Sequence, residues 1–155
     1  MKKFFIYFAA IIFSIIAAAA ITVLLFVPKD PVLDSLPKYE RKEYYSSGGF
    51  QDSTDYAKYA YGIDESIISG NELLRPVTKE DFSTILDYVN HFESVVDVSR
   101  DFPSESYDFD KSIISEGDCF YISNHYEEPE HAFWNYNLYY FDVDACILYN
   151  FHFNI

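Results

Sequence analysis

Hydrophobic and polar positions divide the chain into an uncharged apolar run, a proline-rich link and a longer segment of shorter-period patterns. Residues 4–27 carry no charge, and Ser14 and Thr22 are the only conventionally polar side chains among them. A helix of this length spans about 36 Å, which exceeds a hydrocarbon core of about 30 Å. We therefore expect residues 4–27 to form a transmembrane signal anchor behind a cytoplasmic tail, residues 1–3.

The flanks of this run bear on cleavage and orientation. An Ala-x-Ala pattern occurs within residues 17–20, but cleavage after Ala20 would expose the apolar residues 21–27 to water. An uncleaved anchor is the favoured interpretation, and a cleaved signal is the alternative. Lys2 and Lys3 precede the run, whereas residues 28–31 are neutral overall. This asymmetry favours a cytoplasmic amino terminus and an extracytoplasmic remainder, a single-pass protein of the cell membrane.

The remaining residues predict a stalk and one domain. Three prolines in residues 28–38 indicate an extended, stiff stalk, and residues 39–155 are long enough for one extracytoplasmic domain. Residues 39–45 suit an edge strand or the end of the stalk. Asp52 or Ser53 resembles the N-cap of a short helix that continues to about Tyr61.

The clearest helical pattern covers residues 79–96. Thr78 and Asp81 resemble a capping box. Apolar residues then recur at helical spacing, at Phe82, Ile85, Leu86, Val89, Phe92, Val95 and Val96. This face predicts packing against a core, and it places His91 on or near the polar side as a surface histidine.

The carboxyl-terminal third alternates as strands do. The pattern predicts strands at residues 107–110, 119–126, 134–141 and 147–155, with turns at 116–118 and 142–145. Rings on both faces of residues 134–141 predict a central strand that is covered on both sides. In the last strand, Leu148, Asn150, His152 and Asn154 are expected to face away from the core.

Together these elements predict an α+β fold after a single amino-terminal transmembrane helix. In the small domain, a short and a long helix would pack on an antiparallel sheet of three to five strands that ends in a β-meander.

The predicted meander determines how far apart Cys119 and Cys146 lie, two cysteines that could form a disulfide in an oxidising compartment. A simple meander separates them by two strands, about 9.5 Å, which is too far for a disulfide, so a bridge requires another strand order or a local twist. Two unpaired thiols outside the cell are also uncommon, and both redox states remain open.

Composition excludes two classes of protein. The 15 Tyr and 15 Phe residues are too many for a disordered segment. All 25 acidic residues follow residue 27, as do nine of the 11 basic residues, which gives residues 28–155 a net charge of −16. Such a charge repels phosphate backbones and excludes nucleic acid as a partner.

Candidate chemistry is sparse. His125 and His131 enclose three glutamates in a loop that has zinc-ligating groups but no known zinc spacing. Residues 108–112 begin like a calcium loop, but Ile113 stands where that loop requires glycine. The two cysteines and four histidines allow nucleophile–base pairs without a motif to support one. We therefore assign no catalytic, cofactor-binding or metal-binding residue, and an enzymatic activity is not favoured.

Three functions remain as hypotheses. The first is a non-catalytic interaction module of the cell envelope, which binds a protein partner through the aromatic face of the sheet or a carboxyl-terminal edge strand. The second is an inhibitor or immunity-type protein that acts on a basic envelope enzyme, attracted by the acidic charge. The third is a weak metal-dependent activity at the His125–His131 loop.

Overall fold

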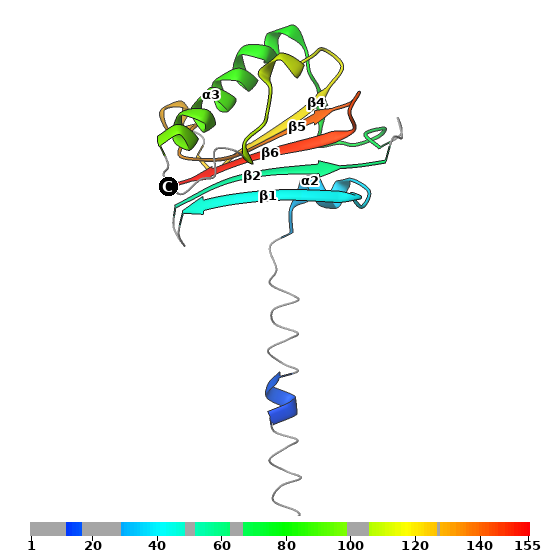
Figure 1. Cartoon of the computed structure of the whole chain (residues 1–155), viewed down its shortest axis with the longest axis vertical. Coiled ribbons are helices and arrows are strands. Elements are labelled where there is room, and N and C mark those ends of the chain that lie inside the picture. The colour runs from blue at the N-terminus through cyan, green and yellow to red at the C-terminus, as the bar shows by residue number, and fades with distance from the viewer. Residues whose placement is uncertain (1–11, 17–28, 49–51, 63–66, 99–105, 127) are drawn as a thin grey trace, which may run out of the picture. The chain divides into compact units, whose positions relative to one another are not determined.

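A computed structural model describes residues 12–16, 29–48, 52–62, 67–98, 106–126 and 128–155 (Figure 1). The chain divides into two units, residues 1–31 and 32–155. In the first unit, residues 12–16 are helical. Among the described residues, no helix is both long enough and apolar enough to cross a membrane. Most of the anchor predicted at residues 4–27 lies outside the described ranges, so it stays a prediction.

The second unit is an α+β fold built on a six-stranded sheet of described residues. Its strands are β1 (Arg41–Gly48), β2 (Ser53–Ala60), β3 (Arg75–Pro76), β4 (Cys119–Asn124), β5 (Asn135–Asp142) and β6 (Ile147–Asn154). Their order is β1-β2-β6-β5-β4-β3, and every neighbouring pair is antiparallel. The predicted α+β class and the carboxyl-terminal meander are confirmed, and the sheet has more strands than predicted.

The long helix is α3 (Phe82–Val98), preceded by a 3-10 turn at Lys79–Asp81. The predicted capping box is confirmed, because the Thr78 backbone N–H donates to Asp81 Oδ2 at 3.0 Å. The short elements are helix α2 (Pro31–Ser35) and two further 3-10 turns, Lys111–Ile113 and Pro129–His131.

Gly48, the last residue of β1, has a φ of +106°, and a Cβ at this position would lie 2.0 Å from the Asp52 carbonyl oxygen. This position therefore requires glycine.

Both faces of the sheet carry a core. Figure 1 shows α3 along one side of the sheet, and there Ile85, Val89 and Phe92 are fully buried against the rings of β2, β5 and β6. On the second face, Val32 and Leu36 pack with residues 67–74 over a smaller core. The two cores explain why β5 carries rings on both faces, as its sequence predicts: Tyr140 belongs to one core and Phe141 to the other.

The short helix predicted from Asp52 or Ser53 to Tyr61 is wrong, because this segment is strand β2. Asp, Ser and the later Gly62 suit a helix terminus, but they suit strand ends equally well. Tyr56 and Tyr59 are buried on opposite faces of the sheet, which only a strand between two covered faces allows. Pairing with β1 on one side and β6 on the other decides the conformation.

Three further local predictions need correction. Within the segment expected to be an extended stalk, Pro31–Ser35 is helical and Val32 is fully buried. Residues 107–110 do not form a strand; Tyr107 and Phe109 pack into the core beneath α3, but no strand among the described residues pairs with this segment. Leu148 faces the second core rather than solvent.

The sheet edges also differ from expectation. Strand β6 lies between β2 and β5, so it is not the carboxyl-terminal edge strand that the first hypothesis offered as one of its two contact surfaces. The edges are β1, with eight residues, and β3, with two residues of which one is proline.

Candidate functional site

A row of polar side chains crosses five strands on the second face of the sheet. Residues opposite each other in antiparallel strands share a face, so the strand register fixes which residues align. The row runs from Ser46 through Asp55, His152 and Asn137 to Ser123. We call these five residues the polar row. None is apolar, although it lies on the same face as the second core.

The polar row lies where the covering elements of that face end. The row four positions along each strand contains Tyr59, Leu148, Phe141 and Cys119, which are at most 5% exposed beneath α2 and residues 67–74. In the polar row, Ser46 is exposed and the other four residues are half-buried. One half of this face is therefore core, and the other half is an accessible polar surface.

His152 is held in place by both of its ring nitrogens. Nδ1 lies 3.2 Å from the Tyr136 carbonyl oxygen, which can only accept, so Nδ1 carries the proton. Nε2 lies 3.1 Å from Ser53 Oγ and 4.0 Å from Asp55 Oδ2. In the neutral ring Nε2 accepts from the Ser53 hydroxyl; in the charged ring it donates and faces the Asp55 carboxylate.

Asp55 is shared between His152 and a tyrosine of the edge strand. The Tyr44 hydroxyl donates to Asp55 Oδ1 at 3.0 Å. Burial, opposed by a hydrogen bond with Ser46 and reinforced by the nearby Asp55 carboxylate, raises the pKa of Tyr44. Tyr44 therefore stays protonated at neutral pH and remains a donor, although its side chain is 52% exposed.

Asn137 differs from its neighbours in the polar row. It stands opposite both His152 and Ser123, yet within the described residues its side-chain amide contacts no protein donor or acceptor. A half-buried amide with two donors and an acceptor is available to a bound molecule.

The Ser53–His152 contact has the distance of a nucleophile and its general base. Its surroundings oppose that chemistry. The Asp55 carboxylate lies 4.0 Å from the same ring nitrogen, Nε2, and a fixed negative charge next to the attacking hydroxyl disfavours the negative charge that develops in acyl transfer. The arrangement instead suits hydrogen bonding to a ligand.

The calcium-like segment 108–112 uses its side chains to attach itself to the rest of the domain. Asp108 accepts from the Tyr56 hydroxyl at 3.0 Å and from Lys58 Nζ at 2.6 Å. Burial alone would raise the pKa of Asp108, but these two hydrogen bonds hold it below its ordinary value. Asp110 accepts from the Ser112 backbone N–H at 2.9 Å.

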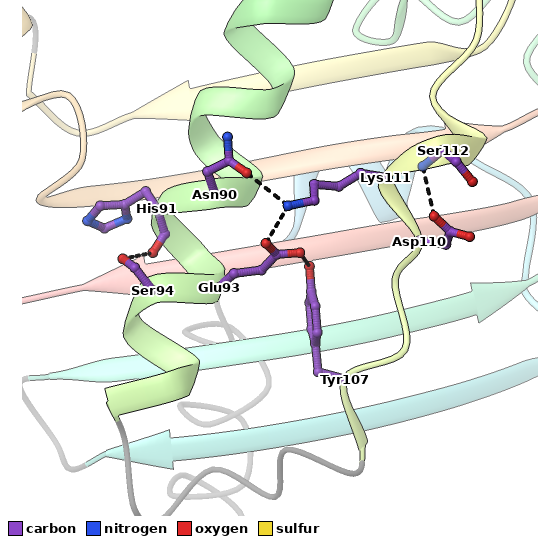
Figure 2. A network of polar contacts seen from close by, with 8 residues as sticks. All are labelled: Asn90, His91, Glu93, Ser94, Tyr107, Asp110, Lys111 and Ser112. Carbon is purple, nitrogen blue, oxygen red and sulfur yellow. Dashed lines mark hydrogen bonds and ion pairs between the residues drawn. The ribbon is translucent and has the colours of Figure 1, made fainter.

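Figure 2 shows how the same segment is tied to α3. Lys111 Nζ donates to Glu93 Oε2 at 2.7 Å and to Asn90 Oδ1 at 3.0 Å, while the Tyr107 hydroxyl donates to Glu93 Oε1 at 3.1 Å. Asp108, Asp110 and Glu93 thus already have partners within the chain, and Lys111 adds a positive charge. This network attaches a loop to a helix and offers no cation site.

The His125–His131 loop holds an aromatic cluster. His131 packs against Trp134 with ring centroids 3.9 Å apart, and Tyr126 contacts both rings. Among the described residues, which exclude Glu127, no group of three or more His, Cys, Asp or Glu side chains is placed to hold a metal ion. Cys119 and Cys146, whose pairing the sequence left open, are free and buried thiols.

Patterns in the sequence indicate only some of the residues of this site. The alternation in β6 places Asn150, His152 and Asn154 on one face, and the residues around β5 place Asn137 on the face opposite Tyr136 and Leu138. The roles of Ser46, Ser53, Asp55 and Ser123 were missed, because they depend on the register of β1, β2 and β4 against the meander. No signal within any one segment indicates that register.

Comparisons of the chain with protein-family models, with curated proteins and with solved structures find no match.

Proposed function

We propose that the chain is a single-pass protein of the cell membrane, with a cytoplasmic amino terminus, whose domain acts outside the membrane as a non-catalytic binding module of the cell envelope. The observation that carries the binding role is the polar row. A sheet that buries aromatic rings on both faces aligns five polar residues across five strands. None of the five belongs to either hydrophobic core; Ser46 is exposed and the other four are half-buried, so part of their donors and acceptors is accessible to solvent.

The proposed binding surface differs from the two surfaces expected from sequence. The aromatic face is covered by α3 and its attached loop, and β6 is internal. The polar row is accessible instead, and Tyr44 lies next to it on the same face. The interaction module would therefore contact its partner through the polar row.

Photo-crosslinking in intact cells tests this role. A photoreactive phenylalanine analogue replaces Ser46, which is exposed in the polar row, in the full-length protein. The matched control carries the same analogue at Ser83, which is exposed on α3. We expect a discrete crosslinked product from position 46 and none from position 83. Identical products from both positions, or none from position 46, would contradict the proposal.

The alternative function is inhibition of a basic envelope enzyme, and the net charge of −16 on residues 28–155 favours it. The two functions differ in salt dependence. Binding driven by the whole acidic surface weakens steeply as ionic strength rises. Binding at the polar row, which contains a single carboxylate, Asp55, depends weakly on salt.

A further inference from the structure

We infer that the polar row binds a neutral oligosaccharide, an inference that rests on the proposed binding role of this surface. Hydroxyl-rich ligands need both donors and acceptors. The polar row supplies an amide at Asn137 and a hydroxyl at Ser123 on neighbouring strands, beside His152, whose ring nitrogens contact Tyr136 and Ser53. Of these, the Asn137 amide makes no contact with a protein donor or acceptor among the described residues.

Aromatic side chains flank the polar row on the same face. The adjacent row reads Tyr44, Ala57, Asn150, Tyr139 and Tyr121 across the five strands, and of its three rings that of Tyr139 is only 5% exposed. Tyr44 is 52% exposed and Tyr121 is half-buried, with its ring paired with that of Tyr139 at 6.3 Å. The rings of Tyr44 and Tyr121, at the two ends of this row, are the accessible ones, and a tyrosine ring combines an apolar surface with a polar tip. They suit the C–H faces of sugar rings, while the polar row suits the hydroxyl groups.

Charge argues against other ligands. An anionic ligand is repelled by a domain region of charge −16. A cationic ligand finds one carboxylate in the polar row, and Asp55 already accepts from Tyr44 and faces His152. An extended peptide binds along a strand edge rather than across a sheet face. A neutral ligand that hydrogen-bonds across several strands fits the remaining chemistry.

Binding measurements on the full-length protein in phosphatidylcholine nanodiscs test the inference. The probes are chitotetraose and maltotetraose, measured by calorimetry and by saturation-transfer NMR. We expect at least one of them to bind the wild-type protein. Asn137→Ala should bind about tenfold more weakly, because it loses hydrogen bonds that together account for such a factor. Ser83→Ala, on exposed α3 surface, should bind as the wild type does.

A second variant keeps the test decisive if Asn137→Ala folds poorly. Tyr44→Ala removes an exposed ring beside the polar row, and it too should weaken binding. Failure of both tetrasaccharides to bind the wild type at millimolar concentration overturns the inference. So does undiminished binding by a folded Asn137→Ala or Tyr44→Ala variant. If saccharides fail while position 46 still crosslinks in cells, the ligand class is wrong and the proposed binding role stands. If both experiments fail, the binding role fails as well.

Discussion

His91 shows, at the scale of single residues, how distant segments determine a side chain's surroundings. The helical pattern places it on the polar side of α3. In the structure its ring packs against Phe133, Tyr136 and Phe153, with centroids 5.0, 5.7 and 5.0 Å away. Its Nδ1 lies 3.2 Å from the Tyr136 hydroxyl. The expectation of an ordinary surface histidine is therefore wrong, because these neighbours come from β5, β6 and the turn before β5.

Burial lowers the pKa of His91, and this makes stability depend on pH. The folded state holds His91 neutral at pH values where the unfolded chain, with a histidine pKa of about 6.5, is protonated. Its contribution to the free energy of unfolding is therefore complete above about pH 6.5 and falls as the pH is lowered towards its folded-state pKa.

We expect His91→Gln to flatten the decline in stability between about pH 7 and pH 5. The measurement is urea denaturation of the full chain in detergent, followed by tryptophan fluorescence. The control is His125→Gln, since His125 is exposed. Asp81, Asp108 and Asp110 have lowered pKa values, so their stabilising contributions are lost only below about pH 4. Equal slopes in the wild type and His91→Gln would contradict this account.

Among the elements, α3 and the meander were predictable and β2 was not. The apolar face of α3 and the alternation in β5 and β6 extend over enough residues to specify one structure each. In β2 the same tyrosines fit both periodicities, and the choice is made by backbone pairing with β1 and β6. Pairing between distant segments cannot be deduced from a local pattern. The polar row was missed for the same reason.

Helix α2 gives a test at this scale, because it belongs to the second core rather than to an extended stalk. Val32 is fully buried with Ala57, Tyr59 and Leu148. We expect Val32→Ala to lower the free energy of unfolding by about 2 kcal/mol, from lost burial and the cavity left behind. Asp34→Ala, on the exposed side of α2, should change it by less than about 0.5 kcal/mol. Equal, small effects measured by urea denaturation would show that α2 does not support the fold.

At the scale of the whole molecule, the proposed binding role rests on a difference between the two faces of the sheet. The α3 face is core along its length, whereas the second face is core at one end and polar at the other. Along the sheet edges, β3 is short and contains Pro76, which limits its capacity to pair with another strand. The accessible half of the second face is therefore where we place the contact with a partner.

The measurement that tests this account most directly is thiol labelling of Ser46→Cys in intact cells. Cys119 and Cys146 are free and only 5% exposed each, so the introduced thiol is the one expected to react with a membrane-impermeant maleimide. The account predicts labelling of Ser46→Cys in intact cells without reductant, and labelling of the wild type only after denaturation. Labelling of Ser46→Cys only after the membrane is permeabilised would place the domain inside the cell. Labelling only after denaturation would show that the polar row is covered.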